Sequence, residues 1–414
     1  MPRSPLHATL SLLAFAACAG EADKPASDKA SADDSALPAA VARVCADGTW
    51  SGWDSPDGLV FVDPAGSDTS GDGSVAAPYQ TLQQALRGSM GDGEIRVALG
   101  AGTYQGPFVL LQGPAGVSLA VQGCGPDETV FTHDLGQSAD ADVAIAGSTP
   151  ITLARLRIED PDGAGVVVRR GANATLANLR VERPRGIGVG VIGATATLRD
   201  VEISDARPGV RLRGWGVVGV DAALTLEDVT VPTRQVMGVY QRGGSLAATR
   251  LALNGGGTPS VGRHGFGVYA HELDLVQIVD SVVEDAHSVG MLFIDATAVT
   301  LTNNRVTRVE PGGTGGGDGI MVARLHATDP LQATLSGNTV SGAARMGIAL
   351  AGVTAALSGN TAGADNGHVV DGRSIFADPS ATVTGDPAAP FDRAELRILV
   401  AYSQETPRFW SQRP

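Results

Sequence analysis

The strongest constraint on the fold is an internal repeat that runs through most of the 414-residue chain. Successive copies start 23, 22, 28, 22, 30, 23, 34 and 22 residues apart. A unit of about 22 residues is typical of a solenoid, because it is too short to bury its own apolar face and has to stack on its neighbours. The copies are LANLRV at 176–181, LRDVEI at 198–203, LEDVTV at 226–231, LTNNRV at 301–306, LSGNTV at 335–340 and LSGNTA at 357–362, with weaker copies starting at 153, 248 and 278.

Each unit has a second anchor, a glycine followed by alternating apolar residues. Clear examples are GVVV at 165, GVYA at 267, GMLF at 290 and GIAL at 347. Alternation with a period of two predicts a strand. The first and third residues after the glycine are apolar in nearly every unit, so we expect them to face the core and the second and fourth to face outward.

The two anchors together resemble the L-x-x-N-x-V … G-I-x-V coils of the right-handed parallel β-helix, or pectin-lyase-like, family. The resemblance covers roughly residues 59–385 and implies an all-β solenoid of about a dozen coils, ~55–60 Å long at the usual strand spacing. It also implies a short N-terminal capping helix over Thr81, Leu82, Ala85 and Leu86. Asn304, Asn338 and Asn360 share one repeat position, where the family places a structural asparagine ladder.

The N-terminal residues are typical of a signal peptide that is removed on export. Arg3 precedes the apolar run ATLSLLAFAA at 8–17, which is too short for a permanent transmembrane helix. FAAC resembles a bacterial lipobox, although Phe15 stands where the family prefers leucine. The resemblance implies cleavage before Cys18 and lipidation of that cysteine, with an ordinary secreted protein as the alternative. Ala19 after the cysteine favours the outer membrane over the inner one.

These features divide the chain into a signal peptide (1–17), a disordered tether (18–44), the β-helix domain (45–390) and a C-terminal tail (391–414). The tether is rich in Ala, Ser, Asp and Pro, and has too little apolar surface to offset the entropy of ordering. The tail should cover the last coils or pack along one side of the stack. We expect an exported protein at the outer membrane or cell surface, with a periplasmic or secreted location as the alternative.

Charge and cysteine content limit the partners. The formal net charge of −14 makes nucleic acid an unsuitable partner, because like charges repel. The only lysines, Lys24 and Lys29, lie in the tether, so a catalytic lysine within the helix is excluded. In an oxidising compartment Cys45 and Cys124 could form a disulfide, but the sequence leaves this open.

Outward positions of neighbouring units predict a ligand-binding surface for an anionic polysaccharide. Two tyrosines would lie in a column beside arginines and a histidine, and aromatic faces with arginine suit such a chain. The alternative is an apolar stripe, formed with Leu292 and Met321 and covered by the tail. The predicted ligand-binding residues are Arg211, Arg213, Tyr240, Arg242, Arg263, Tyr269 and His271.

Two further groups of residues could carry chemistry. His264 and His287 lie three residues before their glycines in adjacent units, and with Asp285 they form a candidate acid/base site. Asp68, Ser70 and Asp72 resemble the first half of a calcium loop, but Tyr79 replaces its closing glutamate. Solvated turn residues are the alternative for both groups, and calcium is the one cofactor to consider.

No known catalytic set of the family is complete in the chain. YAHE at 269–272 matches a uronan-epimerase motif only at His271 and Glu272, and the Asp-Asp pair typical of polygalacturonases occurs only in the tether. The sequence therefore favours a membrane-anchored protein that recognises polysaccharide. A polysaccharide lyase or glycoside hydrolase, and an adhesive or structural surface protein, are the alternatives, because fold alone does not decide function.

Overall fold

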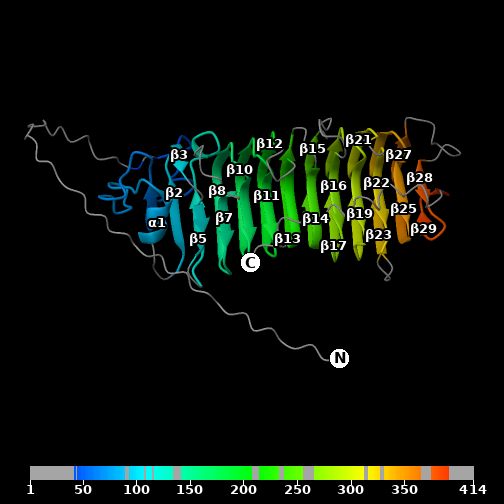
Figure 1. Cartoon of the computed structure of the whole chain (residues 1–414), viewed down its shortest axis with the longest axis horizontal. Helices are drawn as coiled ribbons and strands as arrows, with labels where there is room; N and C mark the ends of the chain where they lie inside the picture. Colours follow the sequence, from blue (N-terminus) through cyan, green and yellow to red (C-terminus); the bar gives the residue numbers. More distant parts are fainter. Residues whose placement is uncertain are drawn as a thin grey trace, which may run out of the picture. The chain divides into compact units, whose positions relative to one another are not determined.

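The computed structural model describes residues 42, 44–88, 93–106, 109–113, 116–133, 141–207, 214–232, 237–254, 265–311, 316–326, 331–364 and 374–390. These residues contain thirty short strands and one helix, α1 (Leu82–Gly88). The strands stack in parallel and in chain order (Figure 1), completing about ten turns where the repeat predicts about a dozen. The predicted signal peptide, Cys18 and the tail lie outside the described residues.

Sheet A is the ladder built from the glycine-led strands. Two long strands, β13 and β14, contribute their first residues to it. The other members are shorter strands. In chain order its members are β4 (Val109–Leu111), β7 (Ala141–Ala146), β9 (Ala164–Arg169), β11 (Ile187–Ile192), β13 (Trp215–Val231), β14 (Met237–Thr249), β16 (Phe266–His271), β19 (Val289–Ile294), β22 (Asp318–Ala323), β25 (Ile348–Ala351), β28 (Ile375–Ala377) and β30 (Ala389–Pro390).

Sheet B holds the first half of the leucine-led repeat, together with the middle of β13 and the end of β14. Its other members are β1 (Val60–Val62), β2 (Ile95–Leu99), β5 (Leu119–Gln122), β8 (Pro150–Glu159), β10 (Asn173–Glu182), β12 (Thr195–Ser204), β17 (Leu275–Val279), β20 (Ala298–Thr302), β23 (Leu331–Ser336), β26 (Val353–Ser358) and β29 (Thr382–Gly385).

Sheet C holds the second half of the same repeat. The ends of β8, β10, β12 and β13 turn a corner from sheet B into it. Its separate strands are β3 (Gly102–Gly106), β6 (Thr129–His133), β15 (Ala252–Asn254), β18 (Val282–Glu284), β21 (Arg305–Val309), β24 (Thr339–Ala343) and β27 (Thr361–Ala364).

The side chains that face inward from the three sheets form one continuous core. Val166, Leu176 and Val181 are its members in a single coil, and each is fully buried. Equivalent residues of the next coils pair directly with them, for example Leu176 with Leu198 and Val181 with Ile203. Stacking therefore buries in every coil the apolar face that a single unit would leave open.

The corner between sheets C and A is where the backbone of one strand approaches the core most closely. A Cβ on Gly165 would lie 2.4 Å from Cγ1 of Val181, and one on Gly267 would lie 2.4 Å from Cγ1 of Val283. Contacts that short do not occur between real carbon atoms, so only glycine fits at this corner. The glycine of each repeat is thus required by packing rather than by a ligand.

The asparagines of the repeat form a hydrogen-bonded column at the corner between sheets B and C. The backbone amide of Ser281 donates to Oδ1 of Asn304 at 3.0 Å. The backbone and side-chain amides of Asn304 both donate to Oδ1 of Asn338 at 3.0 Å. Asn338 repeats this pair to Asn360 at 3.1 and 2.9 Å, and Oδ2 of Asp386 ends the column by accepting from both amides of Asn360.

The same column is aliphatic in the earlier coils. Leu156, Leu179, Val201 and Val229 pair in register there and are buried. The side-chain amides of the later asparagines also donate to carbonyls of the preceding coil, such as that of Leu301 from Asn338. The asparagines of the later coils therefore form a hydrogen-bond network within the core. This network supplies partners for their buried amides.

The N-terminal side of the stack is tied to the first coils in two ways. Cys45 and Cys124 form a disulfide with an S–S distance of 1.99 Å, and 79 residues separate them in the sequence. Cross-linking positions so far apart restricts the unfolded chain and so stabilises the folded one. In helix α1, Leu82 and Ala85 are buried and belong to the main core. Within the described residues, no helix has the length and apolarity needed to cross a membrane.

The ladder can be tested by Asn338→Ala. The substitution removes the acceptor of both amides of Asn304 and the donor to the carbonyl of Leu301. Orphaned buried groups cost roughly 1–3 kcal/mol each, so we expect the free energy of unfolding to fall by about 2–4 kcal/mol. Chemical denaturation measures this change. The exposed Thr354→Ala serves as control, and equal stability of the two variants would contradict the ladder's role.

Candidate functional site

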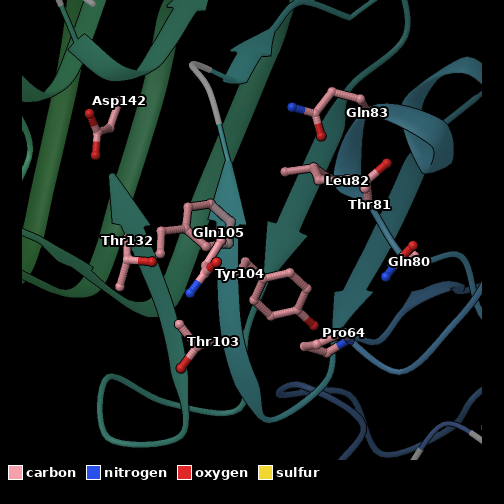
Figure 2. A pocket seen from close by; sticks show the side chains of 11 residues that line it. Pro64, Gln80, Thr81, Leu82, Gln83, Thr103, Tyr104, Gln105, Thr132 and Asp142 are labelled. Atoms are coloured by element: carbon pink, nitrogen blue, oxygen red, sulfur yellow. The ribbon is translucent and has the colours of Figure 1, made fainter. Parts of the chain in front are cut away.

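A cavity of about 260 Å³ opens beside helix α1, among the first coils of the stack (Figure 2). Its walls come from five separate stretches of sequence, which the stacking of β3, β6 and β7 brings together. The family resemblance assigned no function to these positions, and none of them was among the predicted site residues. The lining consists of Pro64, Gln80, Thr81, Leu82, Gln83, Thr103, Tyr104, Gln105, Phe131, Thr132 and Asp142.

Two aromatic rings supply the apolar part of the cavity. Tyr104 of β3 pairs with Phe131 of β6, and their ring centroids lie 5.6 Å apart in an edge-to-face arrangement. The hydroxyl of Tyr104 lies 3.0 Å from the backbone carbonyl oxygens of Val62 and Gly100 and donates to them. Burial raises the pKa of Tyr104, so the hydroxyl stays protonated and a ligand meets its ring.

The rim of the cavity is polar and uncharged except at one residue. Among the residues that the structure describes, the side chains of Gln80, Gln83, Thr103, Gln105 and Thr132 make no hydrogen bond within the protein. Their amides and hydroxyls are therefore available to a ligand as both donors and acceptors. Among the described residues that line the cavity there is no arginine, lysine or histidine, and Asp142 carries the one carboxyl group.

Asp142 pairs with a histidine at the inner edge of the cavity. Nδ1 of His133, the last residue of β6, lies 2.9 Å from Oδ1 of Asp142 in β7. The two side chains are 3% and 10% exposed, respectively. Burial raises the pKa of Asp142 to about 6, and the adjacent His133 opposes part of this rise. A carboxyl group of this pKa exchanges its proton close to neutral pH.

The position of Asp142 is a departure from the repeat. Ala141 pairs with Ala164 and Val143 with Val166, which places Asp142 opposite Gly165 in the glycine column. Later coils keep glycine here because a Cβ would collide with the core. The sequence carries a signal for this site, since DVAI at 142–145 stands where the next coils read GVVV and GVGV. Alternation alone gives the strand but assigns no role to the aspartate that replaces glycine.

The predicted tyrosine column has the expected register but not the expected exposure. Tyr240 pairs with Tyr269 and Arg242 with His271. Both tyrosines are only 2% exposed, and the hydroxyl of Tyr240 lies 2.9 Å from Nε2 of His271. Burial lowers the pKa of His271, which favours its neutral form. The prediction of an open aromatic surface is therefore wrong, because these rings lie in a second apolar cluster on the outer side of sheet A.

Of the arginines expected beside that column, Arg242 is the one among the described residues. Nε of Arg242 lies 3.2 Å from a carboxylate oxygen of Glu272, so its charge is paired. The other predicted positions, Arg211, Arg213 and Arg263, lie outside the described residues, as does His264.

The two described residues of the predicted acid/base group, Asp285 and His287, contact different partners. Asp285 binds the guanidinium group of Arg308 through both carboxylate oxygens. Nε2 of His287 lies 3.3 Å from Glu310, on the neighbouring coil. Each of Asp285 and His287 therefore contacts a residue of the next coil instead of the other predicted residue.

The loop that resembles half of a calcium site is organised around its own turn. Both carboxylate oxygens of Asp68 accept hydrogen bonds from Thr81, from its amide at 2.9 Å and its hydroxyl at 2.7 Å. Asp72 accepts from the amide of Ser74, and Ser70 contacts Ser67. The described residues contain no group of three or more His, Cys, Asp or Glu side chains arranged to hold a metal ion. Here the capped turn, the alternative for this loop, is observed at Asp68, and calcium binding by the loop stays a prediction.

Comparison with models of protein families identifies the family of the repeat. The model of the right-handed β-helix region matches residues 141–362, which is more than half of the chain. The chain belongs to the right-handed β-helix family. The match begins at the strand that carries Asp142, so most of the β-helix protein's cavity is built from residues that precede the family region. No curated protein matches the sequence.

Several solved structures are similar to the β-helix protein at low identity. The A-module of the Azotobacter vinelandii mannuronan C-5 epimerase AlgE4 is 14% identical, with 74% of this chain and 92% of that chain covered and a TM-score of 0.30. The catalytic domain of a GH87 α-1,3-glucanase bound to nigerose is 11% identical (81% and 69% covered, TM-score 0.37). Pectate lyase Pel9A is 14% identical (85% and 81% covered, TM-score 0.38).

The raised pKa of Asp142 predicts a pH-dependent stability. The folded protein holds this proton more tightly than the unfolded chain, in which the pKa is near 3.8. The resulting stabilisation is fully present below pH 4 and is lost as the pH rises through about 6, with a size of ~3 kcal/mol. Asp142→Asn keeps the shape and removes the titration, so its stability should not show this loss.

Thermal unfolding from pH 4 to 7 measures the difference. We expect the melting temperature of the wild-type protein to fall relative to that of Asp142→Asn over this range. The exposed Asp54→Asn serves as the matched control and should follow the wild type. Parallel curves for the wild type and Asp142→Asn would show that the carboxyl of Asp142 is not buried as described.

Proposed function

We propose that this β-helix protein recognises a neutral polysaccharide through the cavity beside helix α1. The observation that supports this proposal is the combination of five unpartnered amide and hydroxyl side chains with the rings of Tyr104 and Phe131. Saccharides present many hydroxyl groups around an apolar ring face, and a site with both kinds of surface complements them. The cavity volume of about 260 Å³ suits one or two sugar units of a longer chain.

The charge of the site favours a neutral over an anionic chain. A uronate would need a cation to compensate its carboxylate, and the described residues that line the cavity include none. Asp142, the one charged group among those described residues, would repel it, and the net charge of −14 adds to the repulsion. The arginine positions predicted an anionic polysaccharide, whereas the charge of this cavity favours a neutral one.

A second candidate function rests on Asp142 and His133. A carboxyl group with a pKa of about 6, hydrogen-bonded to histidine within a cavity, is suited to general acid/base catalysis on a bound saccharide. This would make the β-helix protein a polysaccharide-degrading enzyme. Turnover and binding are separable, because Asp142→Asn removes the exchangeable proton but leaves the rim of the cavity intact.

Binding can be tested with the full chain on immobilised neutral and uronic-acid polysaccharides. We expect retention on a neutral polysaccharide, and Gln105→Ala should weaken it about 3–10-fold, the effect of one lost hydrogen bond. Gln277→Ala, an exposed glutamine on sheet B, is the matched control and should bind as the wild type. Release of reducing ends or of unsaturated sugars is measured in the same samples.

The outcomes separate the alternatives. Binding without product supports recognition, and product formation that Asp142→Asn abolishes supports the enzyme. Retention only on uronic-acid chains would overturn the assignment of a neutral ligand. A lack of response to every polysaccharide would overturn the saccharide proposal and favour an adhesive protein.

We also propose that the β-helix protein is exported and anchored by a lipid on Cys18, at the outer membrane or cell surface. The FAAC sequence and the low-complexity segment after it support this proposal. The disulfide between Cys45 and Cys124 adds support, because such bonds persist in oxidising compartments outside the cytosol.

The anchor can be tested by expressing the chain in a Gram-negative bacterium with labelled fatty acid. The wild type should take up the label and sediment with membranes, whereas Cys18→Ser should do neither. Cys124→Ser removes a different cysteine and should retain the label. Equal labelling of the wild type and Cys18→Ser would overturn the lipoprotein assignment.

A further inference from the structure

The outer side of sheet A is apolar and buried along nearly its whole length. Val218, Tyr240, Leu292 and Met321 project outward from β13, β14, β19 and β22, and none is more than 2% exposed. In a solenoid whose wall is one strand thick, such side chains face solvent unless another segment crosses them. We call the outward side chains of sheet A from Ala141 to Ala389 the outer apolar face.

None of the described elements crosses this face. Strands β16, β19 and β22 contact the strands of their own coil and of adjacent coils, and helix α1 contacts β1. The burial of the outer apolar face therefore requires a part of the chain other than the described strands and helix.

Two polar atoms on the face indicate what kind of cover it needs. Nε1 of Trp215 and the hydroxyl of Tyr269 are buried and have no hydrogen-bond partner among the described residues. Buried donors of this kind normally find an acceptor. A polypeptide crossing the rings would present backbone carbonyl groups as well as apolar side chains, and so would meet both requirements.

We infer that residues 391–414 of the same chain lie along the outer apolar face. This segment begins directly after β30, whose Ala389 is already part of the face. The 24 residues include the apolar side chains needed to pack on it, namely Leu396, Ile398, Leu399, Val400, Tyr402, Phe409 and Trp410. Because the segment is covalently attached, its effective concentration at the face exceeds that of a separate partner molecule.

The length of the segment matches the length of the face. From β30 back to β7 there are ten strand spacings, or about 48 Å. An extended chain of 24 residues reaches about 80 Å. The segment can therefore pass over Met321, Leu292 and Tyr269 and reach Trp215, with length to spare for turns.

The cover would keep an apolar sheet face from associating with a second copy of the protein, because exposed apolar patches of this size promote association. It also explains why the tyrosine column is not open to a ligand. The inference does not depend on saccharide binding, because the cavity beside helix α1 is built from other strands.

Site-specific photo-crosslinking in the full chain tests the inference. Met237→p-benzoylphenylalanine places the photoreactive group at the edge of the outer apolar face, where Met237 is half-buried. We expect the main product to be an intramolecular link to a peptide within 391–414. Gln277→p-benzoylphenylalanine on sheet B is the matched control and should not link to that segment.

The outcomes are distinct. A link between two copies, or to residues 1–41, would overturn the inference by identifying another occupant, and the absence of any link from Met237 would overturn it as well. A chain that ends at Pro390 provides a second measurement. We expect it to bind a hydrophobic dye several-fold more strongly than the full chain and to self-associate, and unchanged dye binding would contradict the cover.

Discussion

The close approach of backbone and core at the corner between sheets C and A constrains most coils of this protein. A Cβ at Gly319 would lie 2.2 Å from Cγ1 of Val340 and 2.5 Å from the carbonyl oxygen of Gly347. Only glycine permits this approach, and the approach brings the two sheets close enough to share one narrow core. The regular register of the strands follows, since successive coils from Gly165 onward repeat the same corner.

The candidate site lies where this constraint is relaxed. In the strand that carries Asp142, aspartate replaces glycine, and its carboxylate turns to His133 and the cavity. The adjoining coils precede the region that matches the family, and their lining residues come from loops, short strands and helix α1. A solenoid is uniform along its length, so a departure from the repeat at one end is a natural place for a binding site.

One feature of the sequence has a structural meaning that alternation alone does not reveal. The strands of sheet A read as continuous apolar runs, such as GMLFI at 290–294 and GIMVA at 319–323. Runs of this kind are typical of a sheet that is buried on both faces. The outward prediction for Tyr240 and Tyr269 was right about direction and wrong about exposure, because the period of two gives the side of the sheet but not what lies against it.

The sequence by itself determined the period, the parallel strands and the column of Asn304, Asn338 and Asn360, because these depend on neighbours one repeat apart. Only the tertiary structure decided that Tyr104, Phe131 and Asp142 share a cavity and that the outer side of sheet A is covered. The physical reason is the range of the contacts involved. Stacking depends on contacts between residues one repeat apart. A cavity and a covered face depend on contacts between irregular segments, which the period of the sequence does not specify.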